Sequence, residues 1–185
     1  MDSCDTEKTL RNLGVNQLDY LIATNEEEDN IAGFVPIVLR NSPKMLIHSG
    51  IPSLSPSYQQ YINIYNQTGK NITFLPRDSI FSFDDAIINL IVPYDDGTPL
   101  TSDDSMVVRI NYGSISILVA TDCAVDCESR ISGVDSNILI SNGGCNSLSY
   151  AFLQDVMPEL VIFSGKPCEE TLNRVQSIDI PYLST

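Results

Sequence analysis

Carboxylates are the residues of this 185-residue chain whose spacing most directly offers chemistry. Glu26, Glu27, Glu28 and Asp29 form one acidic run, and Asp122 stands alone much further along. Three of them on two loops, Glu27, Asp29 and Asp122, could hold Mg²⁺, Mn²⁺ or Ca²⁺ through oxygen, partly by way of water. The alternative is a solvated acidic loop, with Asp29 capping the following turn and Asp122 accepting backbone hydrogen bonds at a strand end.

The other candidate groups are five cysteines and a single histidine. Because five is odd, at least one thiol stays unpaired within the chain, and a chain of this length has core enough to be stable without disulfides. We therefore expect reduced thiols that act as small fillers, with a Cys123–Cys127 pair as the alternative. His48 falls on a predicted strand away from every motif, so it is expected to be an ordinary packed or surface histidine.

Charge and composition disfavour several classes of function. Ten Lys and Arg against 24 Asp and Glu give a net charge of −14, so direct binding to a phosphate backbone is disfavoured. No apolar run reaches the roughly 18 to 20 residues of a membrane span, and residues 1–5 lack the features of a signal peptide. A P-loop, a nucleophile elbow and a dinucleotide-binding glycine motif are also absent from the sequence.

The elements that must position these groups alternate along the chain and predict a single α/β domain over residues 1–185. Helices are predicted over 6–13, 36–40, 57–67, 147–156 and 169–177, and strands over 18–23, 45–48, 72–75, 79–83, 86–92, 106–111, 114–120, 138–141, 160–164 and at Tyr182. This alternation around a block of hairpins implies a mixed sheet, or two sheets, with helices outside.

Four ordered segments carry a more specific pattern. They read Thr-Asn-Glu-Glu-Glu-Asp-Asn-Ile-Ala-Gly at 24–33, Asp-Ser-Met-Val-Val-Arg-Ile-Asn-Tyr-Gly at 104–113 with Thr-Asp at 121–122, Ile-Leu-Ile-Ser-Asn-Gly-Gly-Cys at 138–145, and Gly-Lys-Pro-Cys-Glu-Glu-Thr-Leu at 165–172. Together they resemble the metallo-β-lactamase fold, specifically the extracytoplasmic domain of ComEC-type DNA-uptake channels. The resemblance runs from about Thr9 to the end and implies an αββα sandwich.

The resemblance also marks the positions that hold two metal ions in the family. Histidines of the family are replaced here by Asn25, Asn30, Asn142, Gly143, Lys166 and Cys168, while Glu27, Asp29 and Asp122 remain as carboxylates. An amide is a poor transition-metal ligand, glycine has no side chain, and an ammonium group repels a cation. We therefore expect no metal cofactor, with Mg²⁺, Mn²⁺ or Zn²⁺ as the alternative. If the implied fold is right, Cys145 and Cys168 could lie close enough for a disulfide or a zinc-binding thiol pair, although unpaired thiols are favoured.

These observations predict a catalytically degenerate domain that acts as a structural or interaction module, with a protein partner or a second copy of the chain. The alternative is a metal-dependent phosphodiesterase or nuclease that uses the remaining carboxylates; an acidic module for a basic partner is a third hypothesis. Relatives open with strands that nothing before Thr9 can supply, which indicates a fragment or a reduced sheet with an open edge. If the chain is part of a ComEC-type protein, the resemblance implies that it lies at the extracytoplasmic face of a membrane. If it is not, we expect it in the cytoplasm.

Overall fold

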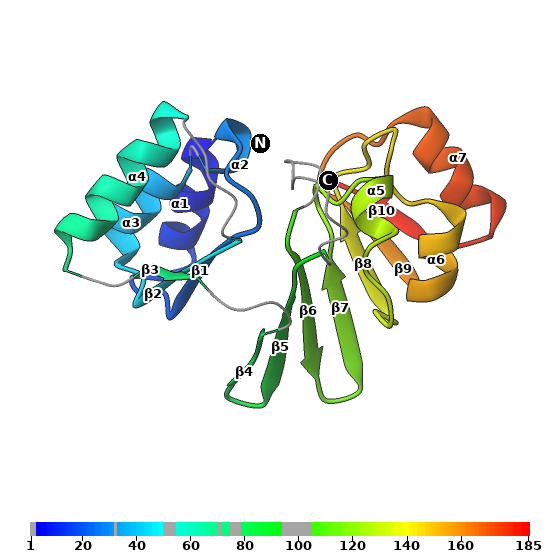
Figure 1. Ribbon diagram of the computed structural model, residues 1–185, viewed down its shortest axis with the longest axis horizontal. Coiled ribbons are helices and arrows are strands. Elements are labelled where there is room, and N and C mark those ends of the chain that lie inside the picture. Colours follow the sequence, from blue (N-terminus) through cyan, green and yellow to red (C-terminus); the bar gives the residue numbers. More distant parts are fainter. Residues whose placement is uncertain (1–2, 32, 50–54, 70–71, 75–78, 94–104) are drawn as a thin grey trace. The chain divides into compact units, whose positions relative to one another are not determined.

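The computed structural model describes residues 3–31, 33–49, 55–69, 72–74, 79–93 and 105–185. The chain divides into two compact units, Met1–Leu75 and Pro76–Thr185 (Figure 1). Each unit has its own sheet and its own buried apolar cluster, and each is described by itself. Within these ranges no helix combines the length and the apolar character needed to cross a membrane.

The first unit is a parallel sheet covered by helices. Its described strands pair in the order β1 (Tyr20–Ala23), β2 (Met45–His48), β3 (Ile72–Phe74). The helices are α1 (Ser3–Asn12), α2 (Glu28–Ile31), α3 (Phe34–Asn41) and α4 (Pro56–Gln67). Parallel neighbours need a crossover, which α2 and α3 supply between β1 and β2, and which α4 supplies between β2 and β3. Figure 1 shows these helices gathered on one side of the sheet.

Helix α4 supplies much of the core of this unit. It begins where the hydroxyl of Ser55 accepts a hydrogen bond from the backbone N–H of Tyr58 at 3.1 Å, with Pro56 in the first turn. Tyr61 and Tyr65, one turn apart, are fully buried with Leu46 of the sheet. These two tyrosines therefore form the buried face of the predicted helix over 57–67.

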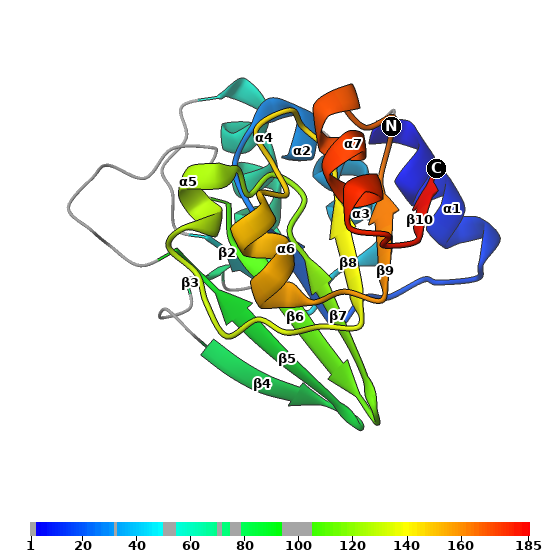
Figure 2. The same ribbon diagram turned by 90° about the vertical axis from the view of Figure 1, so that its right-hand side faces the viewer.

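The second unit is built on a mixed sheet. Among the described residues seven strands pair in the order β10-β9-β8-β7-β6-β5-β4, antiparallel from β4 to β7 and parallel from β7 to β10. The strands are β4 (Ser79–Phe83), β5 (Ala86–Ile91), β6 (Val107–Tyr112), β7 (Ile115–Val119), β8 (Ile138–Ser141), β9 (Leu160–Phe163) and β10 (Tyr182–Ser184). Helices α5 (Val125–Glu128), α6 (Tyr150–Val156) and α7 (Glu169–Ser177) lie on one face of this sheet (Figure 2).

The core of the second unit lies between that face and the helices. Leu118, Leu139 and Val161 from three neighbouring strands are fully buried against Phe152 of α6 and Val175 of α7. Strands β8 and β9 alternate buried and half-buried residues, as expected for parallel strands that helices cover on one face. This packing fixes the loops after β7, β8 and β9, which carry the candidate residues of this unit.

The structure confirms the predicted α/β class and most of the elements. Two helix starts differ from the prediction for local reasons. Helix α3 begins at Phe34 because Pro36 still lies in its first turn, where a missing N–H is tolerated. Helix α6 begins only at Tyr150 because Leu148 has a positive φ of 56° and Ser149 is the N-cap. The short helix α2 was not predicted. The prediction of one domain over 1–185 stays a prediction.

Candidate functional site

The positions marked by the resemblance fall into two sets, one in each unit. In the first unit they follow β1. Asn25 is buried, and its Oδ1 atom accepts hydrogen bonds from Asn30 Nδ2 at 2.7 Å and from the backbone N–H of Glu27 at 3.1 Å. The side chain of Glu27 is exposed, and Asp29 lies in α2 with its side chain outside the described part of the chain. Two amides at histidine positions of the family are thus bonded to each other.

A buried polar network lies beside this loop and corrects the expectation for His48. His48 Nδ1 is 2.6 Å from Glu26 Oε1, and both side chains are almost completely buried. The same carboxylate oxygen accepts the Ser49 hydroxyl at 2.6 Å. His48 is a packed histidine, but it is not remote from the motifs, and the acidic run is not a uniformly solvated loop. The contact joins residues 22 positions apart, so no local pattern could reveal it.

The network also fixes the tautomer of the histidine. Because a carboxylate only accepts, the His48 Nδ1 atom must carry a proton, and in the neutral ring Nε2 then accepts the Tyr61 hydroxyl, 2.5 Å away. Burial raises the pKa of Tyr61, with smaller contributions from Tyr58 and Glu26, so this hydroxyl keeps its proton. The ring of Tyr58 meets His48 edge to face at 5.2 Å between centroids. These contacts brace β2 against α4.

In the second unit the loops after β7 and β8 meet. Asn142 Nδ2 donates to Asp122 Oδ1 at 2.6 Å, and Asn142 Oδ1 accepts the backbone N–H of Gly144 at 2.9 Å. The backbone N–H of Asn142 donates to the carbonyl of Thr121 at 3.2 Å. The resemblance marks Asp122 as the carboxylate that bridges two metal ions in the family. Here that carboxylate is bonded to the amide of Asn142, which the resemblance aligns with a histidine.

The next loop is held by tight backbone contact. Gly143 has a positive φ of 74°, and a Cβ atom there would lie 2.7 Å from Cβ of Pro167, so only glycine fits. The carbonyl of Gly143 accepts the backbone N–H of Cys168 at 2.8 Å. The Lys166 side chain is exposed and forms no ion pair with any described residue. Gly143 therefore permits the sharp turn after β8.

The state of the cysteines contradicts the expectation of reduced thiols. Cys145 forms a disulfide with Cys168, and Cys123 forms a second with Cys127; their Cα atoms are 5.1 Å and 5.2 Å apart. These separations lie in the normal range for a disulfide. Five cysteines must leave one thiol unpaired within the chain but still allow two disulfides, and the fold brings both pairs together. The Cys145–Cys168 bond had been an alternative, and it joins the β8–α6 and β9–α7 connections.

Across the described ranges no group of three or more histidine, cysteine, aspartate or glutamate side chains is arranged to hold a metal ion. Each of the two sets instead contains side chains that bond to one another. The residues that sequence analysis missed are Glu26 as a buried partner, and Glu128, whose buried carboxylate accepts the backbone N–H groups of Leu148 and Ser149 before α6. Burial raises the pKa of Glu128, and these hydrogen bonds oppose that rise in part.

Solved structures share the architecture. The metallo-β-lactamase fold protein YhfI from Bacillus subtilis aligns with a TM-score of 0.59 at 12% identity over 96% of this chain and 79% of its own. Tm1679, a metal-dependent hydrolase of the β-lactamase superfamily, aligns with a TM-score of 0.60 at 10% identity over 96% of this chain and 80% of its own. The chain therefore has the metallo-β-lactamase fold.

Comparison with a curated protein supports the more specific likeness, the one to ComEC-type proteins. The chain is 24% identical over 187 aligned residues to ComE operon protein 3 of Bacillus subtilis (strain 168), which confirms the likeness to ComEC-type proteins. The match takes in 93% of this chain but only 24% of the length of that relative. No protein-family model matches the chain.

Proposed function

We propose that this chain is a catalytically degenerate metallo-β-lactamase-like domain, related to the ComEC-type competence and DNA-uptake proteins, and that it acts as a structural or interaction module. The observation that carries the proposal is the hydrogen bond from Asn142 to Asp122 at 2.6 Å. The side chain at a histidine position donates to the one carboxylate that would bridge two ions. In the first unit two amides bond to each other instead, with Asn30 Nδ2 donating to Asn25 Oδ1.

The donor set does not fit the zinc or manganese pair of a hydrolytic centre. Such a centre acidifies a bound water with neutral imidazoles and carboxylates that leave one position open. The lone pair of the Asn142 amide nitrogen is delocalised into the carbonyl group and is not available to a metal, and the carbonyl oxygen accepts the backbone N–H of Gly144. Cys168 is not a thiolate while it is bonded to Cys145. Lys166 adds an exposed positive charge to the same loop.

The disulfides support a role outside the cytoplasm. Disulfides form and persist in oxidising compartments and are rare in the reducing cytosol. The Cys145–Cys168 bond ties together two loops that metal ligands would otherwise hold in an intact relative. A covalent link keeps the loop surface ordered without a cation, which suits a module that presents a fixed surface to a partner. No resident cofactor is part of the proposal.

Metal analysis combined with an activity assay tests the proposal. Purified oxidised protein is incubated with Mn²⁺, Zn²⁺ or Mg²⁺, desalted and analysed for bound metal, and phosphodiester hydrolysis is measured in parallel. We expect less than stoichiometric metal and no turnover in the wild type, in Asp122→Asn and in Asp179→Asn, which makes the same change at an exposed position. Stoichiometric Zn²⁺ or Mn²⁺, or turnover lost only in Asp122→Asn, would favour the metal-dependent phosphodiesterase or nuclease.

A further inference from the structure

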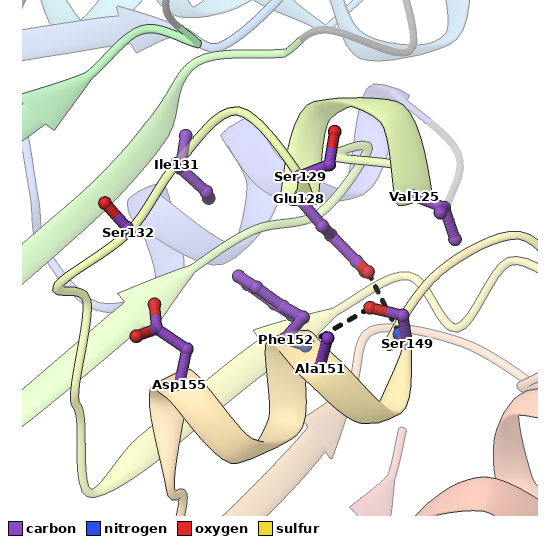
Figure 3. Close-up of a pocket in the computed structure, with 9 residues that line it drawn as sticks. All are labelled: Val125, Glu128, Ser129, Ile131, Ser132, Ser149, Ala151, Phe152 and Asp155. Carbon is purple, nitrogen blue, oxygen red and sulfur yellow. Dashed lines mark hydrogen bonds between the residues drawn. The ribbon is translucent and has the colours of Figure 1, made fainter.

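A pocket of about 380 Å³ lies in the second unit between α5 and α6, among residues that the candidate site does not include (Figure 3). Four of its residues are apolar, two are carboxylates and three carry hydroxyls. The lining consists of Val125, Glu128, Ser129, Ile131, Ser132, Ser149, Ala151, Phe152 and Asp155. Its volume suits a small ligand or a single side chain rather than a large cofactor.

One of the two carboxylates has an unused acceptor. Asp155 is half-buried, and its Oδ2 atom is shielded from solvent with no hydrogen-bond partner. Buried polar atoms almost always have a partner, so an orphan of this kind calls for a physical explanation. Figure 3 shows the carboxylate of Asp155 extending from α6 toward the segment that carries Ser132. Because Asp155 lines the pocket, a donor bound at this end would satisfy the atom once the carboxylate rotates toward it.

The electrostatic setting of Asp155 favours a positively charged donor. Asp155 lies in the last turn of α6, where the helix dipole disfavours a negative charge. The second carboxylate, Glu128, is already engaged by the backbone N–H groups of Leu148 and Ser149. No lysine, arginine or histidine lines the pocket. The lining of the pocket therefore supplies no counter-ion for the carboxylate of Asp155.

The remaining walls select the kind of cation. Ile131 and Phe152 present apolar groups at the end of the pocket that holds Ser132 and Asp155, and Val125 lies at the opposite end (Figure 3). An ammonium group offers several donors, one for a carboxylate and others for hydroxyls, and an attached alkyl chain would cover the apolar wall. A bare Ca²⁺ requires about six to eight oxygen ligands, which one free carboxylate and hydroxyls do not supply.

We propose that the pocket between α5 and α6 binds an alkylammonium group, with Asp155 as its counter-ion and the wall formed by Ile131 and Phe152 as the seat of its alkyl chain. The same chemistry occurs in free aliphatic amines and in the side chain of lysine on a protein. The site is independent of the candidate metal positions and of the proposed loss of catalysis.

Titrations followed by amide chemical shifts in two-dimensional NMR test this site. The probes are pentan-1-amine, Nα-acetyl-lysine N-methylamide and, as an uncharged control, pentan-1-ol. We expect saturable shifts confined to the residues around α5 and α6 for both amines, with dissociation constants of about a millimolar. Tighter binding of pentan-1-amine would identify the free amine as the source, and tighter binding of the blocked lysine would identify a protein.

Matched variants decide whether Asp155 is responsible. Asp155→Asn keeps the shape of the side chain and should weaken amine binding by about tenfold or more, because a charge-assisted hydrogen bond is lost. Asp179→Asn, outside the pocket, should leave binding unchanged. Absence of shifts in the wild type, equal binding of the alcohol, or an unchanged affinity in Asp155→Asn would each overturn the proposal. The wild-type titrations remain decisive even if a variant fails to fold.

Discussion

Replacing Cys145 and Cys168 together by serine removes the covalent link between the β8–α6 and β9–α7 connections. Both positions are at least partly exposed, so serine places no new polar group in the core. The neighbouring contacts, including the hydrogen bond from the Cys168 N–H to Gly143, can form without the sulfur atoms. The variant therefore isolates the contribution of the cross-link.

The expected loss follows from the length of chain that the bond closes. The two cysteines are 23 positions apart. In the chain-entropy description, closing a loop of this size lowers the entropy of the unfolded state enough to stabilise the fold by about 3.4 kcal/mol. A chain of this size loses roughly 2 to 4 °C of melting temperature per kcal/mol, so the midpoint should fall by about 7 to 14 °C.

The shorter disulfide provides an internal comparison. Cys123 and Cys127 are only 4 positions apart, so the same description gives about 1.9 kcal/mol for their bond. Urea unfolding of oxidised wild type, the Cys145→Ser/Cys168→Ser variant and a Cys123→Ala/Cys127→Ala variant yields the three free energies of unfolding. We expect the longer loop to cost more. A loss below about 1 kcal/mol for the serine pair would refute the view that this bond holds the two connections together.

Three further predictions concern single side chains. Gly143→Ala should destabilise the protein by about 2 kcal/mol or more in urea unfolding, since its Cβ atom would collide at a positive φ, whereas Gly165→Ala, with open space around it, should stay within about 0.5 kcal/mol. Glu26→Ala leaves a buried histidine donor unpaired and should cost about 1 to 3 kcal/mol by the same measurement, while exposed Glu27→Ala should cost under about 0.5 kcal/mol. Burial raises the folded-state pKa of Glu128, so its protonation favours folding at low pH, and that contribution disappears as the pH rises through the folded pKa. The free energy of unfolding of the wild type relative to Glu128→Gln should therefore decrease from pH 4 to pH 7. A difference that stays flat or rises over this range would contradict the expectation.

Much of the fold was accessible from the sequence because its elements have strong local patterns. Strand β8 and helix α7 lie within the predicted bounds, since an apolar run between turn residues and a periodic segment after proline define them. Helix α2 was missed because its four residues have no apolar period. Its position depends on a tertiary contact, the hydroxyl of Ser57 donating to Glu28 from α4.

The candidate site was accessible only as a set of positions. Residue types at Asn142 and Asp122 indicated that the ligands had changed, but not that the two side chains would bond to each other. The pairing of Cys145 with Cys168 and the burial of Glu26 against His48 depend on contacts across 23 and 22 positions. Such contacts are set by the packing of strands and helices, so no short pattern records them.

Anomalous X-ray diffraction from crystals grown with millimolar Mn²⁺ or Zn²⁺, measured at the absorption edge of each metal, tests the loss of the metal centre most directly. We predict no anomalous peak within coordination distance of Asp122 and an Asn142 amide that still donates to its carboxylate. Two well-occupied ions that share the Asp122 carboxylate, with a water bound between them, would contradict the proposed loss of catalysis.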